Sequence, residues 1–328
     1  TFENVGKVAQ AIADFINSEQ RQKMGVYREL NISYRPPSSG LVVGYDTRRL
    51  SPQFGDTVAR VLAANGIPVF LVNQPNPTPV VAHAVLQKQT AGAVMITASH
   101  NPPEYNGIKF KPEYAGSALP EYTEKIEKRV QDILAKGEEA RENPTAPIEI
   151  FDPRPRYLER IVEFVDWDAL RRSNFQVVVD PLYGAGRGIL FGLLKEKGVS
   201  VEEIHGELDP SFGGLNPEPI GEHIKPLIKE VRRLGADVGL ALDGDADRIG
   251  AVDEKGNFVN SHEIFSLILR YLCRDLGWRG AVVKTFSTTQ MINILAEKYK
   301  LELFETPVGF KHIARLMLSK DVLIGGEE

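Results

Sequence analysis

The sequence predicts an α/β protein made of three tandem domains, with mixed, mostly parallel sheets and helices packed on both faces. Two observations carry this prediction. Short runs of β-branched residues alternate with amphipathic helical patterns along the whole chain, which is typical of parallel α/β layers. The alternation restarts twice, which divides the 328 residues into domains at 1–146, 147–256 and 257–328.

The first domain is expected to alternate strands with helices and to close with a charged helix. Its predicted strands are 41–45, 69–72 and 93–97. Its predicted helices are 52–64, 79–89 and 121–141. The first two begin with a proline, whose missing N–H is not needed in the first turn of a helix. Residues 142–147 read Glu-Asn-Pro-Thr-Ala-Pro and predict a linker.

The second and third domains repeat the same alternation. In the second domain we expect strands at 175–180, 199–204 and 237–242, with helices at 188–197 and 224–234. In the third domain we expect strands at 281–285, 301–305 and 322–324, with helices at 263–276, 290–300 and 310–318.

Unusual polar residues follow one buried strand in each domain. They lie at 97–106, 243–248 and 325–328. Ligands of open α/β sheets bind outside the carboxyl ends of the strands. We therefore expect the three loops to converge on an active-site cleft between the domains.

The loop at 243–248 reads Asp-Gly-Asp-Ala-Asp-Arg directly after an apolar strand. It places Asp243, Asp245 and Asp247 at alternate positions, where their charges repel unless a cation neutralises them. Carboxylate oxygens suit Mg²⁺ or Ca²⁺, and the small residues between them allow a tight fold around an ion. A solvent-exposed turn of aspartates is the simpler alternative.

An EF-hand is a second alternative for this loop. Counted from Asp243, Glu254 falls at position 12, as that motif requires. However, Arg248 stands at position 6, where the EF-hand has glycine, and the flanking segments predict strands and not helices. The sequence therefore argues against an EF-hand.

The loop after strand 93–97 reads Thr-Ala-Ser-His-Asn-Pro-Pro. Its two prolines prevent an immediate helix, so the chain must turn and display Ser99 and His100. A serine hydroxyl is a poor nucleophile unless a base, a metal or a positive charge assists it, and His100 and Lys109 are close in sequence. Taken alone, such a turn is more often structural, with the hydroxyl capping a local amide.

Together these stretches resemble the α-D-phosphohexomutase family, which includes phosphoglucomutase and phosphomannomutase. Residues 97–102 look like its phosphoserine loop, 243–248 like its Mg²⁺ loop and 325–328 like the start of its sugar-recognition loop. The motifs occur in the family's order, and the resemblance extends over essentially the whole chain. It implies an isomerase of carbohydrate metabolism.

The resemblance implies a phosphorylated serine beside a metal ion. Ser99 is similar to the serine that holds the phosphoryl group. Asp243, Asp245 and Asp247 are similar to the three Mg²⁺-binding carboxylates, and an oxygen on Ser99 completes the metal ligands.

Further residues take on roles by the same resemblance. His100 and Lys109 are similar to basic residues near the phosphoserine that are implicated in proton transfer, and Arg248 to an arginine that contacts phosphate or substrate. Glu327 is similar to the glutamate that binds sugar hydroxyls. Residues 306–311, which end at Lys311, resemble a loop that orients the substrate.

The implied reaction interconverts hexose 1-phosphate and hexose 6-phosphate. Phosphoserine donates its phosphoryl group to the sugar, giving a hexose 1,6-bisphosphate that reorients and returns its other phosphate to Ser99. The Gly-Glu-Glu start of the third loop favours glucose over mannose or glucosamine.

Two segments of the family pattern are missing from this sequence. The family begins with a Thr-Ser-Gly segment upstream of the helix that starts here near Phe2. A fourth domain, which normally holds the substrate's non-reacting phosphate, would follow residue 328. Because remote binding energy supports catalysis, we expect a truncated chain with little or no mutase activity.

The composition excludes several other classes of function. A net charge of −5 argues against nucleic-acid binding, and no apolar run is long enough to span a membrane. The single cysteine, Cys273, excludes an internal disulfide and is expected to be a small buried apolar group in a cytoplasmic protein. The expected partners are small sugar phosphates, and the expected oligomeric state is monomer or dimer.

Three other functions remain open. A metal-dependent phosphatase could use an Asp-x-Asp nucleophile, although such a motif is expected near the N-terminus. A non-catalytic module could bind Mg²⁺ and sugar phosphate. The glycine-rich stretch 184–188 could hold a nucleotide phosphate, but it lacks the full Gly-x-Gly-x-x-Gly spacing and predicts a tight strand-to-helix turn.

Overall fold

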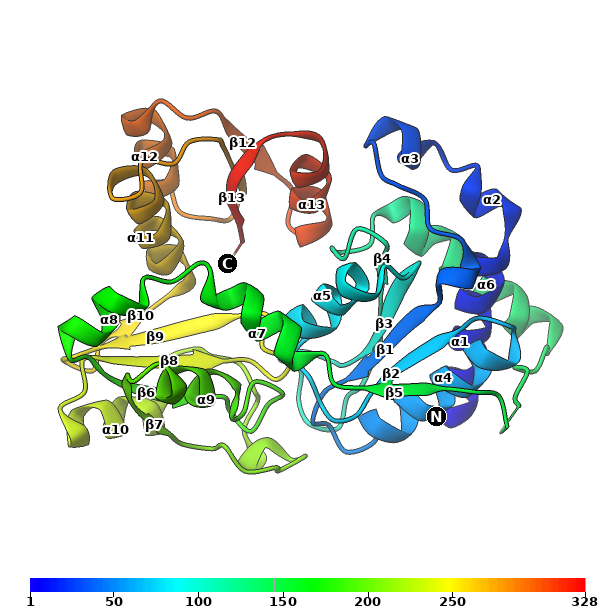
Figure 1. Ribbon diagram of the computed structural model, residues 1–328, viewed down its shortest axis with the longest axis horizontal. Coiled ribbons are helices and arrows are strands. Elements are labelled where there is room, and N and C mark those ends of the chain that lie inside the picture. Colours follow the sequence, from blue (N-terminus) through cyan, green and yellow to red (C-terminus); the bar gives the residue numbers. More distant parts are fainter. Residues whose placement is uncertain (144, 328) are drawn as a thin grey trace.

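The structure of the protein is a computed structural model that describes residues 1–143 and 145–327 (Figure 1). The predicted linker 142–147 includes Pro144, and the predicted sugar-recognition loop 325–328 includes Glu328. These two residues lie outside the described residues. The remaining chain forms three α/β domains in sequence order, which confirms the predicted fold class.

The first domain is built on a five-stranded sheet in the order β4-β3-β1-β2-β5. Its strands are β1 (Leu41–Tyr45), β2 (Val69–Val72), β3 (Gly92–Ile96), β4 (Ile108–Pro112) and β5 (Glu149–Phe151). Only β4 is antiparallel to its neighbour. The central strand β1 is buried at every residue, as expected for a parallel strand that is covered on both faces.

Helices cover both faces of this sheet. They are α1 (Phe2–Asn17), α2 (Glu19–Gln22), α3 (Gly25–Glu29), α4 (Ser51–Ala64), α5 (Thr78–Lys88), α6 (Pro120–Lys136) and the 3₁₀ turn η1 (Pro37–Ser39). Neighbouring residues of β1 show the two faces, because Gly44 lies against Val81 of α5 and Tyr45 lies against Gly55 of α4. Helix α6 ends at Lys136, before the predicted end at residue 141, because Gly137 adopts a left-handed conformation that terminates it.

Strand β5 differs from the expected organisation. The predicted boundary placed residues 147–256 in the second domain, but β5 pairs in parallel with β2 of the first sheet. This edge strand has only three residues and is largely exposed, so it gives no hydrophobic pattern that a sequence reading could detect. The boundary after residue 146 stays a prediction.

The second domain has a five-stranded sheet in the order β10-β9-β8-β6-β7. Its strands are β6 (Gln176–Asp180), β7 (Ser200–Glu203), β8 (Val238–Leu242), β9 (Ile249–Asp253) and β10 (Phe258–Val259). Its helices are α7 (Arg154–Val162), α8 (Trp167–Ser173), α9 (Ile189–Glu196), α10 (Lys225–Leu234) and the 3₁₀ turn η2 (Phe212–Gly214). On one face Val178 packs against α10, and on the other Val177 and Val179 pack against α8 and α9.

The third domain has a parallel three-stranded sheet in the order β12-β11-β13. Its strands are β11 (Ala281–Thr285), β12 (Leu303–Thr306) and β13 (Val322–Gly326), and its helices are α11 (Ser261–Arg274), α12 (Met291–Tyr299) and α13 (Phe310–Ser319). Asn260 and Glu263 form a capping box that starts α11. Cys273 is free and buried in α11, as predicted.

The domains follow one another around the molecule. In Figure 1, α7 lies between the first and second domains, and α13 lies on the side of the third domain that faces the first. Among the helices that the structure describes, none has both the length and the apolar character needed to cross a membrane.

Candidate functional site

The acidic loop connects the antiparallel strands β8 and β9. Asp243 and Asp245 are buried and Asp247 is exposed, yet one carboxylate oxygen from each lies within 4.8 Å of the others. Oδ1 of Asp243 accepts hydrogen bonds from the backbone N–H groups of Asp247 (2.9 Å) and Arg248 (3.0 Å), and Ala246 adopts a left-handed conformation that closes the turn. Two strands flank the loop, so it is not an EF-hand.

This concentration of negative charge is costly without a cation. Burial and the neighbouring carboxylates raise the pKa of Asp243 well above its ordinary value. Burial acts in the same direction on Asp245, but Lys109 and Thr78 lower the pKa of that carboxyl. The loop therefore favours either a proton or a positive ion at its centre.

The serine loop, residues 97–107, connects β3 to β4 and reaches across to the second domain. Ser99 is 7% exposed and adopts a left-handed backbone conformation, with a φ of 53°. Its N–H donates to Thr97 Oγ1, and its hydroxyl donates to Asp243 Oδ2 at 2.9 Å. The predicted phosphoserine and a predicted metal ligand are thus in direct contact.

Two further groups of the first domain contact Asp245. Its Oδ2 accepts hydrogen bonds from Thr78 Oγ1 (2.6 Å) and Lys109 Nζ (2.9 Å). Lys109 Nζ also lies 3.4 Å from Asp247 Oδ2. Burial disfavours the lysine charge, but these carboxylates outweigh it and raise the pKa of Lys109. The ammonium group is therefore a fixed positive charge beside the acidic loop.

The acidic loop has the donors that a hard divalent cation requires. Oδ1 of Asp245 is buried and has no hydrogen-bond partner, although a carboxylate oxygen is a strong acceptor. Together with oxygens of Asp243, Asp247 and Ser99, it provides ligands of the kind that Mg²⁺ prefers. The residues present fit the ion that the family resemblance implies.

His100 and Arg248 lie at the margin of this site. The ring of His100 is half-buried, its Nδ1 has no partner, and burial together with Arg248 lowers its pKa. The guanidinium of Arg248 is 43% exposed, and its nearest carboxylate belongs to Glu218 at 3.9 Å. Their predicted roles in proton transfer and substrate binding stay predictions.

The residues that are predicted to recognise the sugar lie in the third domain. Glu327 Oε2 accepts a hydrogen bond from the N–H of Gly309 at 3.1 Å, so the predicted 325–328 loop and the predicted 306–311 loop meet. Lys311 is exposed on the first turn of α13. Within the described residues, hydrogen bonds link neither Glu327 nor Lys311 to the acidic loop. Both roles stay predictions, and Gly325 and Gly326 prove to be the end of β13.

Several residues that build this site were not predicted from the sequence. Thr78 is one, and Arg48 and Asp46, which directly follow β1, are others. Arg48 binds carbonyl groups of the serine loop. A signal existed, because Asp46-Thr47-Arg48 also lies at the carboxyl end of a buried strand. Their partners, however, are distant in sequence.

The glycine-rich stretch 184–188 has a packing role. Ala185 N–H donates to Gly244 O at 2.9 Å. A Cβ on Gly184 would lie 2.8 Å from that same oxygen, so only glycine allows this approach. The stretch therefore packs against the backbone of the acidic loop at Gly244, which agrees with the predicted tight turn.

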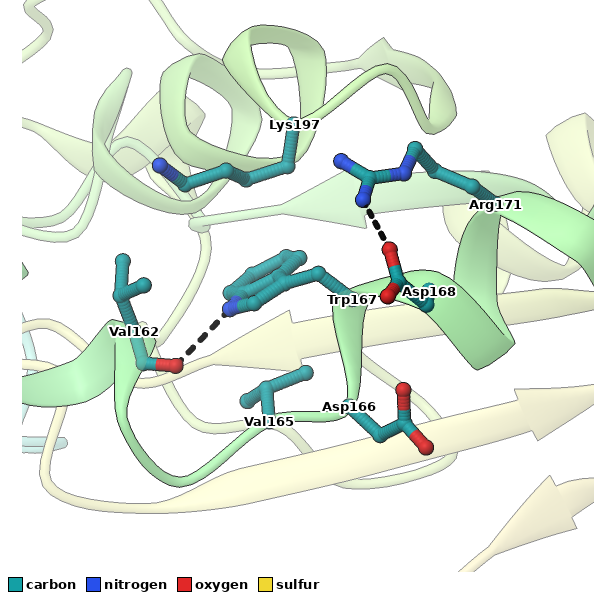
Figure 2. A pocket seen from close by; sticks show the side chains of 7 residues that line it. All are labelled: Val162, Val165, Asp166, Trp167, Asp168, Arg171 and Lys197. Atoms are coloured by element: carbon teal, nitrogen blue, oxygen red, sulfur yellow. Dashed lines mark hydrogen bonds and ion pairs between the residues drawn. The ribbon is translucent and has the colours of Figure 1, made fainter.

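A separate hollow of about 430 Å³ lies elsewhere on the second domain. Figure 2 shows Trp167 within it, with its indole N–H donating to the carbonyl of Val162 and with Arg171 paired to Asp168 nearby. The hollow is open, and it shares no residue with the acidic loop or the serine loop.

Comparisons with known proteins agree with this architecture. Three family models match the chain, described as α/β/α domains I, II and III of phosphoglucomutase/phosphomannomutase. They match residues 1–136, 155–256 and 260–328, in the order of the three sheets. The matches define the class as that of the α-D-phosphohexomutases.

Individual relatives support the same conclusion. A phosphoglucomutase/phosphomannomutase of Thermococcus kodakarensis is 36% identical over 88% of this chain and 62% of its own length. A Pyrococcus abyssi protein assigned as a phosphoglucosamine mutase is 35% identical, also over 88% of this chain and 62% of its own length. The chain therefore spans less than two thirds of these relatives.

A solved structure is also similar throughout. A crystal structure from Thermus thermophilus, assigned as a phosphomannomutase, matches with a TM-score of 0.88 and 34% identity. The match covers 100% of this chain and 70% of that one. The chain belongs to the phosphoglucomutase/phosphomannomutase family.

Proposed function

We propose that this chain carries the phosphoryl-transfer site of a mutase that interconverts hexose 1-phosphate and hexose 6-phosphate through a phosphorylated Ser99. The observation that carries the proposal is the 2.9 Å hydrogen bond from Ser99 Oγ to Asp243 Oδ2, which joins loops from two domains. The phosphatase alternative needs an aspartate as nucleophile. Here we propose a serine as the nucleophile, because the Ser99 hydroxyl faces the buried Asp243 of the acidic loop.

Each half of the reaction is one phosphoryl transfer. In the first, the bond between phosphorus and Ser99 Oγ breaks while a bond forms to a free hydroxyl oxygen of the sugar phosphate. The hydroxyl proton passes to His100, which follows Ser99 in the chain. In the second, the bond between the other phosphorus of the bisphosphate and its sugar oxygen breaks while a bond forms again to Ser99 Oγ, and the proton on His100 passes to that sugar oxygen. Atoms and charge balance over the two halves.

The acidic loop and Lys109 balance the negative charge of the phosphoryl group during its transfer. Asp243, Asp245, Asp247 and Ser99 would hold Mg²⁺, which when bound supplies positive charge beside the phosphoryl oxygens. Lys109, 2.9 Å from Asp245, is positioned to neutralise the same oxygens from the first domain.

The third domain is the proposed site of sugar recognition. Glu327 and the N–H of Gly309 are hydrogen-bonded to each other, so a glutamate and a loop that both resemble sugar-binding elements lie together. We propose glucose as the preferred sugar. The named relatives differ in the sugar phosphate on which they act, so specificity must be measured. The free, buried Cys273 suits the reducing cytoplasm in which we place this activity.

Intact-mass analysis tests the proposal directly. The chain is incubated with glucose 1,6-bisphosphate and MgCl₂, and the modified residue is mapped by peptide sequencing. We expect one stable phosphoryl group on Ser99, its loss in Ser99→Ala, and its retention in the control Ser173→Ala, which alters an exposed serine of α8. A labile acyl phosphate on an aspartate would indicate the phosphatase. Binding of the bisphosphate without phosphorylation would indicate the non-catalytic module.

A further inference from the structure

Arg48 occupies an unusual position behind the serine loop. Its side chain is 1% exposed and lies at the carboxyl end of β1. Nη2 donates to the carbonyls of Ser99 (2.7 Å) and Asn101 (2.6 Å), and Nη1 donates to those of Pro102 (2.7 Å) and Tyr105 (3.1 Å). One guanidinium group therefore holds four carbonyls of a single loop.

The remaining donor of Arg48 is also engaged. Nε donates to Asp46 Oδ2 at 3.1 Å, so all five N–H groups of the side chain have partners. Asp46 Oδ1 accepts from Ser51 Oγ, which in turn accepts from the side chain of Asn106 at 2.8 Å. This network contacts the serine loop from residue 99 to residue 106.

The second domain covers the same guanidinium. The ring of Phe212 is fully buried, and the Arg48 guanidinium carbon lies 5.0 Å from its centre. Phe212 belongs to the long loop before α10, and the carbonyl of Pro217 in that loop accepts a hydrogen bond from Gly244 N–H at 3.0 Å. The loop that contains Phe212 and Pro217 thus contacts two parts of the site: Arg48, which binds the serine loop, and the acidic loop.

We propose that Arg48 is a positioning residue. Four of its five donors fix four carbonyls between residues 99 and 105, Phe212 covers its guanidinium group, and the Ser99 hydroxyl is thereby aimed at the acidic loop. Ser99 needs such support because its left-handed backbone is unfavourable for a residue with a side chain. Only arginine offers five donors in a rigid planar fork, and lysine offers three from one point. The catalytic consequence rests on the proposed function, but the loop-positioning role does not.

Arg21 provides a matched control in the same domain. It is also fully buried, donates to the carbonyls of Arg35 and Ala91, pairs with Glu113 at 3.0 Å and lies over a tyrosine ring. Its contacts do not include the serine loop. Replacing either arginine removes a buried cation, so a general loss of stability should affect both variants alike.

The experiment compares Arg48→Gln, Arg48→Lys and Phe212→Leu with Arg21→Gln in the full chain. The first measurement is hydrogen–deuterium exchange of peptides that cover residues 97–107. The second is the rate of Ser99 phosphorylation by glucose 1,6-bisphosphate as a function of its concentration. We expect roughly 10-fold faster loop exchange in both Arg48 variants and little change in Arg21→Gln. We expect a maximal phosphorylation rate about 100-fold lower for Arg48→Gln, with a similar half-saturating concentration.

The outcomes separate this inference from the proposed function. Unchanged loop exchange in the Arg48 variants, or equal slowing in Arg48→Gln and Arg21→Gln, would overturn the positioning role. If wild-type Ser99 is never phosphorylated, the proposed function fails and the exchange measurement alone decides the role of Arg48. If Arg48→Gln does not fold, the test uses Arg48→Lys and Phe212→Leu in its place. Phosphorylation of Ser99 that is several-fold slower in these variants would support the positioning role, and wild-type rates would overturn it.

Discussion

The first domain is joined to the second by buried hydrogen bonds and to the third by partly exposed ion pairs. At the first junction, Ser99 contacts Asp243 and Thr78 contacts Asp245, and all four residues are less than a tenth exposed. At the second junction, Arg315 of α13 pairs with a carboxylate from α3 and another from α6. The guanidinium is 34% exposed there.

This contrast identifies the junction that fixes the geometry of the site. Buried hydrogen bonds to carboxylates are directional and are screened much less by salt, so they hold the serine and acidic loops in one arrangement. Exposed ion pairs contribute little and weaken as ionic strength rises. The serine loop and the acidic loop are therefore held rigidly together, while the third domain is joined to the first by contacts that solution conditions can change.

The largest expected effect is the response of the first junction to metal. Mg²⁺ at 100 times its dissociation constant should stabilise the chain by about 2.7 kcal/mol, because the ion neutralises the three converging carboxylates. The stabilisation is measured by urea denaturation in MgCl₂ and, for comparison, in NaCl of equal ionic strength. Asp243→Asn should lose the response, whereas Asp253→Asn, outside the loop, should keep it. Equal stabilisation by both salts would contradict a specific site.

A smaller effect is expected from a single hydrogen bond across the first junction. Thr78→Val keeps the shape of the side chain but leaves a buried oxygen of Asp245 without its 2.6 Å donor. The free energy of unfolding should fall by about 2 kcal/mol. The control Thr57→Val, which alters a solvent-facing hydroxyl on α4, should stay within about 0.5 kcal/mol of wild type. Similar losses in both variants would mean that this bond does not hold the junction.

A pH effect is expected from a histidine–aspartate pair beside Tyr183, whose carbonyl accepts a hydrogen bond from Thr47 of the first domain. His205 Nδ1 lies 3.0 Å from the buried Asp180, and this hydrogen bond raises the pKa of His205 despite its partial burial. Because the folded-state pKa is raised, the stabilisation is complete below the unfolded pKa and is lost as pH rises through the folded one. The free energy of unfolding of wild type, measured by urea denaturation, should exceed that of His205→Asn by about 1 kcal/mol at low pH and by less at high pH. A difference that does not vary with pH would refute it.

The smallest effect is expected at the second junction. Arg315→Gln removes the ion pairs with Glu29 and Glu121 and should lower stability by about 0.5 kcal/mol. The difference should vanish in about 1 M NaCl, where exposed charges are screened. Arg156→Gln, which removes a pair within α7, is the control for a general surface effect. A loss as large as that of Thr78→Val would erase the distinction between the two junctions.

Much of the fold was predictable because its signals are local. Strands β1, β2 and β11 were predicted with their observed bounds, since each contains a short apolar run and pairs in parallel with both of its neighbours. Helices α7 and α8, which are short and rich in charge, and strand β5, which has three residues, were not predicted. These elements are defined by the partners on which they pack, and those partners lie elsewhere in the chain.

The residues of the site also fall into those with a local sequence signal and those without one. Ser99 and the aspartates of the acidic loop belong to compact motifs, so their neighbours in sequence point to them. Arg48 and Thr78 act on partners 51 and 167 residues away, and single side chains carry no such signal. Residue roles that depend on long-range contact become visible only when the domains are placed together.

Strand β13 has a consequence for how the third domain meets its surroundings. The first two sheets continue past β3 and β8 with antiparallel strands, β4 and β9, whereas among the described residues nothing pairs with the outer edge of β13. Such an edge presents a row of N–H and C=O groups to any extended peptide. The edge of β13 is therefore a position where this sheet can accept a further strand, as the other two sheets accept β4 and β9.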